Sequence, residues 1–376
     1  MPAACLPVFV YNVFVELPSI HRRLTRQVKV GRVAVGGGAP VSVQSMTNTR
    51  TADAAATLRQ IERLAEAGCE IVRVATPTVE DTAALKKIVA RSPLPVVADV
   101  HFHFQRALEA IDAGVHKIRL NPGNIADRQA VRKVIRAAQA AGVPIRVGVN
   151  EGSIVDRKDA ARARRQREKP LAELMLETVE SYLEPFRQES FEDLVLSAKS
   201  HDAMVCVAAY RALSNRFDYP LHLGLTHAGT AETGTIRSVA ALGTLLAEGV
   251  GDTVRISLSG DPVREVAAAR ELLFSLRLRP RQGVEIIACP TCGRTQADVD
   301  ALAEQVRADL ADVKRHVTVA VMGCVVNGPG EAAGVDVAAC CGPARAAIYR
   351  AGKHVRTVPL DKVVAELVAE VRKMVE

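Results

Sequence analysis

The chain has 376 residues, of which 48% are hydrophobic and 24% are charged, and its formal charge at pH 7 is +7. This composition is typical of a globular protein and excludes a disordered one. The absence of tryptophan and the low aromatic content disfavour the base-stacking surfaces of single-strand-binding proteins. The length exceeds what one hydrophobic core usually supports, so we expect two domains. The positive charge favours an anionic partner and does not distinguish nucleic acid, a membrane surface and a phosphorylated small molecule.

Residues 1–21 are predicted to be an N-terminal extension. The apolar run that starts at Cys5 lacks a basic leader and is interrupted by Asn12 and Glu16, which argues against a signal peptide. No run of the sequence is long enough to span a bilayer. Eight cysteines in such a chain are too few for a disulfide scaffold, and their C-x-x-C spacing indicates metal or redox chemistry in a reducing compartment. We therefore expect a cytoplasmic protein.

From about residue 40, short β-branched runs alternate with longer runs of helical period. The predicted strands are Val41–Met46, Ile71–Ala75, Val96–Val100, Lys117–Asn121, Ile145–Asn150, Leu194–Lys199, Leu221–Thr226 and Val254–Leu258. The helices that follow them are predicted to begin near Ala52, Val79, Phe104, Asp127, Pro170, Asp202, Thr233 and Pro262. Eight such units predict a (β/α)8 TIM barrel over residues 22–278. A doubly wound sheet is the alternative, but its glycine-rich turn follows the first strand, whereas Gly36–Gly38 precede it here.

Polar side chains interrupt these strands near their C-terminal ends, where they would line the mouth of the barrel. The cationic ones are Arg73, Arg119, Arg146, Lys199 and Arg255. The others are Asp99, Asn121, Asn150, Ser197, Thr226 and Ser257. Strand alternation also turns Lys117 to the same side as Arg119 and Asn121. A single arginine at such a position is more often a solvated charge or an ion pair. Five cations at one mouth predict a phosphate or diphosphate pocket, because guanidinium forks match phosphate oxygens.

The segment Arg157–Lys169, after the fifth strand, is strongly basic. Such a run binds nucleic acid in some proteins. No aromatic or modular feature accompanies it, so we interpret it as a solvated helix face or a mobile loop beside an anion site. We do not expect nucleic acid to be the partner.

Residues 279–376 are predicted to form a small α+β domain behind a linker punctuated by proline and glycine. Its expected elements are a strand at Val284–Ala288, a helix at Ala297–Val313, a strand at Val317–Val321, a hairpin-like stretch at Ala347–Thr357 and a helix at Leu360–Met374. Both strands are followed by turns rich in glycine and proline. These turns carry the chemistry of the domain.

Cys289 and Cys292 lie on the first turn, and Cys324 and Glu331 lie on the second. Thiolates are soft ligands that suit an iron–sulfur cluster or zinc. In a cluster, the carboxylate of Glu331 would be a weak fourth ligand on one iron, which a substrate can replace.

A structural zinc site would instead need a fourth cysteine or histidine. Cys340 or Cys341 would supply it, so the thiol pattern alone leaves zinc open.

Several segments resemble the bacterial 4-hydroxy-3-methylbut-2-en-1-yl diphosphate synthases of the methylerythritol phosphate route to isoprenoids. The likeness runs from about residue 22 to the C-terminus, and no single motif carries it alone. The segments are Gln44–Thr49, Gly68–Ala75, Ala98–Phe102, Asn121–Ile125, His222–Thr226, Gly251–Ser257, Cys289–Arg294 and Val321–Glu331.

The resemblance implies reductive ring opening and dehydration of 2-C-methyl-D-erythritol 2,4-cyclodiphosphate on a [4Fe-4S] cluster. It implies that Cys289, Cys292, Cys324 and Glu331 hold the cluster and that the five cations of the barrel mouth hold phosphates. The polar residues that would assist are Asn121, Asn150, Ser197, Thr226, Ser257 and, from the second domain, Asn327. It also implies flavodoxin or ferredoxin as electron donor and a homodimer in which one chain's cluster domain closes over the other chain's barrel.

The resemblance implies catalytic roles for Glu331, Asp99 and His227. Asp99 would contact a substrate hydroxyl or take part in proton transfer. The chain departs from the family at His227, where a glutamate is usual. Histidine exchanges protons near neutral pH, so we expect either retained activity with a shifted optimum or reduced activity. Cys340 and Cys341 replace part of a glycine-rich hairpin. The rival hypotheses are a pterin-type barrel transferase with a zinc module and a cluster-bearing sensor or RNA-binding protein.

Overall fold

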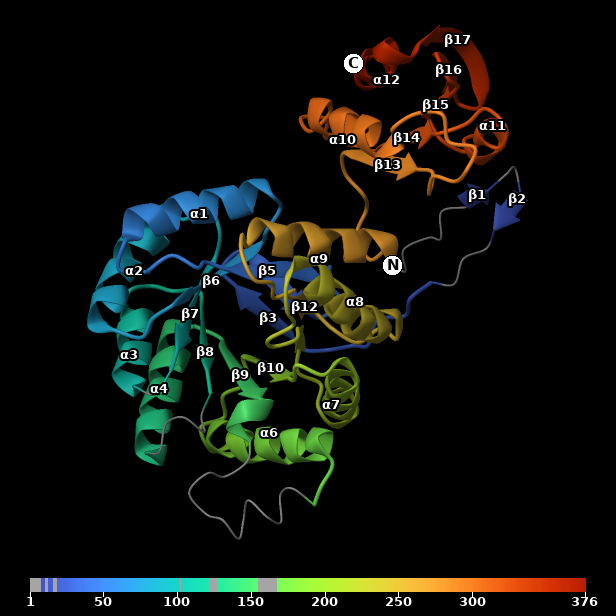
Figure 1. Cartoon of the computed structure of the whole chain (residues 1–376). Helices are drawn as coiled ribbons and strands as arrows, with labels where there is room; N and C mark the ends of the chain where they lie inside the picture. The colour runs from blue at the N-terminus through green and yellow to red at the C-terminus, as the bar shows by residue number, and fades with distance from the viewer. Residues whose placement is uncertain (1–7, 11–12, 16–18, 102, 122–126, 155–167) are drawn as a thin grey trace. The chain divides into compact units, whose positions relative to one another are not determined.

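The computed structural model describes residues 8–10, 13–15, 19–101, 103–121, 127–154 and 168–376 of the chain. Contacts between residues divide the chain into two compact units (Figure 1). One unit is Ile20–Arg279, and the other combines Pro280–Glu376 with Met1–Ser19. Most of the basic segment Arg157–Lys169 and much of the N-terminal extension lie outside the described residues. Among the described helices, none combines the length and apolar character needed to cross a membrane.

The larger unit is the predicted TIM barrel, with eight parallel strands in one sheet. Their order in the sheet is β10-β9-β8-β7-β6-β5-β12-β11. A parallel bridge between Leu196 and Leu221 joins the two ends and closes the barrel. The strands are β5 (Ser42–Met46), β6 (Ile71–Ala75), β7 (Val96–Val100), β8 (Lys117–Leu120), β9 (Ile145–Asn150), β10 (Leu194–Lys199), β11 (His222–Leu223) and β12 (Thr253–Val254).

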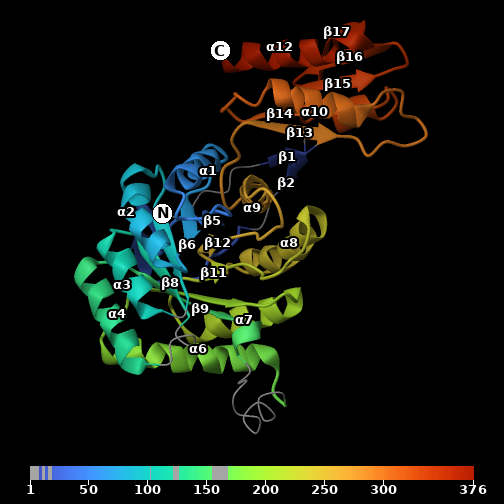
Figure 2. The same cartoon turned by 60° about the vertical axis from the view of Figure 1, so that its left-hand side comes forward.

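The helices of the barrel surround this sheet, as Figure 2 shows from a second direction. Acidic or hydroxyl side chains begin several of them: Asp53, Asp127 and Asp202 accept hydrogen bonds from the first turn, and Thr78 forms a capping box with Asp81. The helices are α1 (Ala54–Glu66), α2 (Val79–Arg91), α3 (Phe104–Asp112), α4 (Arg128–Ala141), α6 (Leu171–Gln188), α7 (Ala203–Arg216), α8 (Ala231–Ala247) and α9 (Val263–Ser275).

The last two barrel strands are shorter than predicted. The ladder between β11 and β12 stops at Leu223, although the Arg255 amide still donates to the Leu223 carbonyl at 2.9 Å. Beyond Gly224 the chain turns toward the end of β10, because the Thr226 amide donates to the Ser200 carbonyl at 3.1 Å. The residues predicted as strand therefore lie at the mouth of the barrel as irregular chain.

A hairpin of β3 (Gln27–Val30) and β4 (Val33–Gly36) lies at the opposite end of the barrel and was not predicted. Its Val30 and Val35 are buried against Ile71 and Val97 from the barrel interior. These apolar side chains close the N-terminal end of the barrel. Strand β3 alternates between exposed and buried residues, but the four-residue strands of the hairpin are too short to stand out in the sequence.

The smaller unit has a five-stranded mixed sheet in the order β13-β14-β15-β16-β17. Its first three strands are parallel and its last two antiparallel. The strands are β13 (Val284–Ala288), β14 (Val317–Met322), β15 (Val337–Cys341), β16 (Arg345–Arg350) and β17 (Lys353–Pro359). The helices are α10 (Val299–Asp309), the single turn α11 (Gly328–Glu331) and α12 (Val363–Val375). Short 3-10 turns span Glu151–Ser153 and Leu360–Lys362, and β1 (Val8–Val10) pairs with β2 (Val13–Val15).

Strand β15 was not predicted, because its sequence Val-Ala-Ala-Cys-Cys lacks strand alternation. All five of its residues are buried in the centre of the sheet, which explains the continuous apolar run. The apolar core beside it includes Val319, Ile348 and Leu367.

Glu370 on α12 is a buried carboxylate that links the helix to the sheet. It accepts hydrogen bonds from Arg350 Nε at 2.8 Å, Arg356 Nη2 at 2.7 Å and Lys373 Nζ at 3.0 Å. Burial opposes its ionisation, but these three cations outweigh burial and lower its pKa to about 2. The unfolded chain, with an ordinary glutamate pKa of about 4.3, then binds the proton more readily. The carboxylate therefore stabilises the fold fully above about pH 5, and this contribution is lost as the pH falls toward 2.

We expect Glu370→Gln to lower the free energy of unfolding of the smaller unit by about 1–3 kcal/mol at pH 7, because a neutral amide replaces a charged acceptor. Glu366→Gln is the matched control, because Glu366 pairs with the same Arg356 at the surface and should change stability by less than about 1 kcal/mol. Urea unfolding followed by circular dichroism from pH 7 to pH 3 measures both effects. Equal losses in the two variants would contradict the assignment.

Candidate functional site

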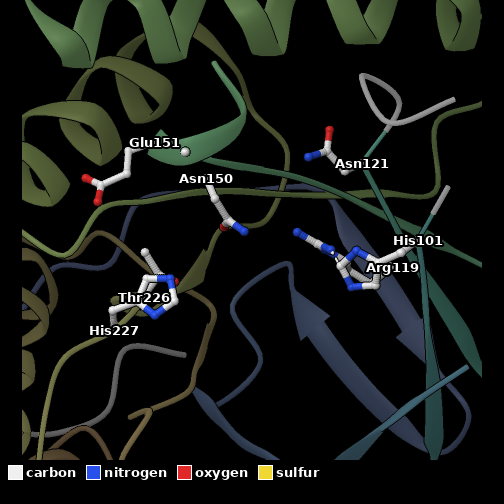
Figure 3. Close-up of a pocket in the computed structure, with 8 residues that line it drawn as sticks. His101, Arg119, Asn121, Asn150, Glu151, Thr226 and His227 are labelled. Atoms are coloured by element: carbon white, nitrogen blue, oxygen red, sulfur yellow. Dashed lines mark hydrogen bonds between the residues drawn. The ribbon is translucent and has the colours of Figure 1, made fainter. Parts of the chain in front are cut away.

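The mouth of the barrel contains two adjoining cavities that share His101, Arg119, Asn150, Thr226 and His227. The larger, of about 270 Å³, is lined by Arg73, Asp99, His101, Arg119, Arg146, Asn150, Ser197, Lys199, Leu225, Thr226, His227, Arg255 and Ser257. The smaller, of about 210 Å³, is lined by His101, Arg119, Asn121, Asn150, Glu151, Gly152, Thr226 and His227. The structure thus brings together every barrel residue that the sequence analysis placed at the site. Figure 3 shows His101 and Arg119 on one side of the smaller cavity and Thr226 and His227 on the other.

Asp99 is the buried carboxylate among these cations. Its oxygens lie 3.7 Å from Arg73 Nε, 3.4 Å from Arg119 Nη1 and 3.4 Å from His101 Nε2. Burial raises the pKa of Asp99, but Arg73, His101 and Arg119 together lower it below the ordinary value, so the group is ionised. Its lone pairs are directed at cations, which makes it a charge-balancing residue in this conformation.

Arg255 is balanced separately by Glu265, which the sequence analysis missed. Arg255 Nε and Nη2 donate to the two carboxylate oxygens of Glu265 at 3.1 and 2.9 Å. Glu265 also accepts from Ser45 Oγ at 2.9 Å and from the Leu258 amide at 3.1 Å. This bidentate pair fixes the guanidinium at the cavity wall. The sequence signal that could have identified Glu265 was its place in the first turn of α9, the helix that follows Arg255 in the chain.

The positive charges of Lys199 and Arg146 are less well balanced by nearby negative charges. Burial lowers the pKa of Lys199 well below its usual value, and the charges of Arg146, Arg73, Arg255 and Arg119 lower it further. Burial likewise lowers the pKa of Arg146. Cations held this way attract a multiply charged anion strongly, because the anion relieves their mutual repulsion.

Two glycines make room for the cationic side chains. A Cβ on Gly148 would lie 2.8 Å from Ser197 Oγ and 3.3 Å from Arg119 Nε. A Cβ on Gly224 would lie 2.6 Å from Lys199 Nζ. A larger residue at either position would displace a cavity-lining group, so the interior is shaped for long cations.

His227 is exposed at the cavity and has a φ of +52°, in the left-handed region. A non-glycine residue in this region is uncommon and indicates a constrained position. His227 lines both cavities from this position.

His101 and Glu151 line the cavities and were not predicted as site residues. Strand alternation could have identified His101. This residue directly follows β7 and lies two positions after Asp99, so the two side chains are expected on the same side. Glu151 directly follows β9 and accepts hydrogen bonds from Ser200 Oγ and the His201 amide. It therefore joins the loops after β9 and β10.

The thiols of the smaller unit lie at one end of two neighbouring parallel strands. β13 pairs with β14 up to Ala288 and Val321, so Cys289 and Cys324 follow strand ends at the same edge. The Gly323 amide donates to Cys289 Sγ at 3.2 Å. Backbone amides of Asn327 and Val326 lower the pKa of Cys324 and thus favour its thiolate. Cys292 is exposed on the same turn as Cys289.

Glu331 is exposed at the end of α11, and Asn327 begins that turn without a side-chain capping bond. Both lie in the smaller unit. Cys340 and Cys341 are buried, and burial raises their pKa values to about 12 and about 11.

The donor set of the two turns consists of three thiols and one carboxylate, and thiolates are soft ligands that suit an iron–sulfur cluster. Amide donors to the sulfurs are also typical of iron–sulfur sites. Cys289, Cys292, Cys324 and Glu331 therefore fit a cluster.

Comparison with known proteins decides the family. The family model of the GcpE TIM-barrel domain matches residues 25–270, and that of the GcpE C-terminal domain matches residues 285–373. This chain belongs to the GcpE family. Similar proteins named 4-hydroxy-3-methylbut-2-en-1-yl diphosphate synthase (flavodoxin) include one from Geobacter sulfurreducens, 48% identical over 93% of this chain and 98% of the relative. Another, from Salinispora tropica, is 49% identical over 96% of this chain and 91% of the relative.

Two solved structures show a distant likeness to this member of the GcpE family. An N-acetylneuraminic acid synthetase from Leptospira borgpetersenii aligns with 77% of this chain and 99% of its own, at 12% identity and a TM-score of 0.47. A dihydropteroate synthase from Xanthomonas albilineans aligns with 67% of this chain and 97% of its own, at 16% identity and a TM-score of 0.44. Such weak likenesses say nothing about activity.

Proposed function

We propose that this chain converts 2-C-methyl-D-erythritol 2,4-cyclodiphosphate to 4-hydroxy-3-methylbut-2-en-1-yl diphosphate. The reaction takes up two electrons and two protons, breaks one carbon–oxygen bond to the cyclic diphosphate and releases one water. The names of its relatives support this proposal over nearly their whole length. The observation that carries it is the cationic mouth of the barrel, in which four arginines and a lysine line one cavity with Asp99 as a carboxylate among them.

In this proposal the cations hold the diphosphate as it changes from a cyclic to a linear form. Arginine is suited to this work because its fork keeps contact with phosphate oxygens as they move. The amide and hydroxyl side chains at the same mouth would orient the carbon skeleton: Asn121, Asn150, Ser197, Thr226 and Ser257. Asp99 would keep Arg73 and Arg119 in place, and His227 would exchange protons with the hydroxyl groups.

We further propose the division of labour that the sequence suggests, with residues 22–278 binding substrate and residues 279–376 holding a [4Fe-4S] cluster. Cys289, Cys292, Cys324 and Glu331 would hold the cluster. When bound, the cluster would supply the electrons and a Lewis-acidic iron whose carboxylate ligand can be replaced. Asn327 would steady the loop that carries Glu331.

Flavodoxin as electron donor is supported by the names of the relatives, and ferredoxin is the alternative donor. A homodimer and a cytoplasmic location are parts of the same proposal.

The test is anaerobic turnover. The full chain, purified under nitrogen, is incubated with the cyclodiphosphate and either reduced flavodoxin or reduced ferredoxin, and the product is identified by mass spectrometry. We expect the linear diphosphate to form and to require both the donor and the cluster. Cluster-loaded protein that binds the cyclodiphosphate but forms no product with either donor would refute the proposal.

A further inference from the structure

A second set of polar side chains lies inside the barrel, deeper than the cavity. Strand alternation identifies it, because residues two apart face the same side of a strand. Lys117 precedes the cavity-lining Arg119 by two residues, and His222 precedes Thr226 by four. These side chains, which we call the inner cluster, are Ser42, Gln44, Lys117, Arg146, His222 and Thr253.

The inner cluster lies between the cationic mouth and the apolar floor. Arg146 belongs to both levels, because it also lines the larger cavity. Below the cluster, Val30 and Val35 of the hairpin close the barrel. Every member is at most 1% exposed. The cluster is therefore an enclosed polar layer and not part of the open mouth.

Every member has at least one side-chain polar atom without a hydrogen-bond partner among the described residues. These atoms include Lys117 Nζ, Nε and Nη1 of Arg146, both side-chain amide atoms of Gln44 and both ring nitrogens of His222. Buried polar groups in proteins are nearly always hydrogen-bonded. Leaving one unpaired costs several kcal/mol of stability unless a water or a ligand satisfies it. So many unsatisfied polar atoms in one layer indicate that water or a bound ion occupies it.

The charge balance favours an anion. Arg146 cannot lose its proton, so its buried charge needs a counter-charge. Asp99 is the carboxylate among the inward-facing residues of the described barrel strands, and it already contacts Arg73, Arg119 and His101. Burial lowers the pKa of Lys117, and Arg146 and Arg73 lower it further, so an anion beside Lys117 would also keep it protonated.

We propose that the inner cluster binds a small inorganic monoanion of the halide class, separately from the diphosphate at the mouth. Lys117 Nζ, the buried edge of Arg146 and Gln44 Nε2 would donate to it. A halide ion suits this place because it accepts hydrogen bonds from any direction and is small enough for an enclosed layer. It would neutralise charge in the barrel core without occupying the substrate cavity.

The first test locates the ion. Crystals of the full chain are grown with bromide in place of chloride, in the presence of inorganic pyrophosphate, and anomalous scattering is measured at the bromine edge. Pyrophosphate fills the mouth, so bromide bound only there is displaced. We expect a peak within contact distance of Lys117 Nζ that persists with pyrophosphate. Its absence, or peaks at the mouth alone, would overturn the proposal.

The second test measures stabilisation. Unfolding temperatures are recorded in bromide and in gluconate at equal ionic strength for the wild type, Lys117→Met and the control Lys87→Met, which changes an exposed lysine on α2. We expect bromide to raise the unfolding temperature of the wild type and of Lys87→Met by roughly 2–5 °C, and to have no effect on Lys117→Met. An equal rise in all three proteins would show an adventitious ion only. If Lys117→Met does not fold, the bromide experiment on the wild type decides alone.

Discussion

Replacing Cys324 with serine is expected to abolish both the visible absorbance of the cluster and turnover of the cyclodiphosphate. A serine hydroxyl is a hard, protonated ligand that does not replace a thiolate on iron. Cys324 is also the site thiol whose pKa the surrounding amides lower, so its thiolate is favoured before any iron binds. We expect iron content and activity to fall together to background in anaerobically purified protein, measured by iron and sulfide analysis and by product formation.

Cys69→Ser is the matched control for this prediction. Cys69 is buried in the barrel, and its thiol donates to the Ile71 carbonyl at 3.1 Å, a bond that a serine hydroxyl can also make. This variant should keep its colour and its iron. A Cys324→Ser protein with a full cluster spectrum and normal turnover would show that the ligand assignment is wrong. Stoichiometric zinc in fresh wild-type protein would contradict the whole cluster proposal.

Removing Arg255 should lower the stability of the barrel and removing Lys199 should not, although both changes should weaken anion binding to a similar extent. Arg255→Met leaves the buried carboxylate of Glu265 without its cation, so the free energy of unfolding should fall by about 3–5 kcal/mol. Lys199→Met instead removes one of several mutually repelling buried cations. Its free energy of unfolding should stay the same or rise.

Both variants should bind inorganic pyrophosphate about 10–100-fold more weakly, because each loses charged hydrogen bonds worth about 1.5–3 kcal/mol. Titration calorimetry measures the binding, and urea unfolding in phosphate-free buffer measures the stability. Arg264→Met, an exposed change on the same helix as Glu265, is the control and should alter neither quantity. A loss of stability in Lys199→Met as large as in Arg255→Met would mean that Lys199 has a carboxylate partner in the folded protein.

The barrel could be predicted because its evidence is local. The eight strand–helix alternations are visible in the sequence, and the alternation of each strand gives the face on which its polar residues lie. Arg119 and Asn121 therefore appeared together at the cavity, as expected. The boundaries were less predictable for β11 and β12, because their ends depend on hydrogen bonds to neighbouring segments far away in the chain.

The carboxylates that balance the cations could not be assigned in advance. Asp99 was predicted to contact a substrate hydroxyl or to transfer a proton, and this role stays a prediction. The structure places its oxygens beside Arg73 and Arg119. Glu265 was missed because it lies on a helix whose packing brings it to Arg255 through the barrel wall. Which acid meets which base is a property of the closed barrel and not of any one segment.

The sequence by itself determined the eight strand–helix units of the barrel, the inward side of their strands and the places of the thiols, since these follow from residue spacing and from periods of two and 3.6. Only the tertiary structure decided how deeply Lys117 lies and which cations are paired. It also decided that β15 forms the centre of the second sheet. Burial and charge pairing arise between segments that are distant in the chain, so they are settled when the barrel and the sheet assemble.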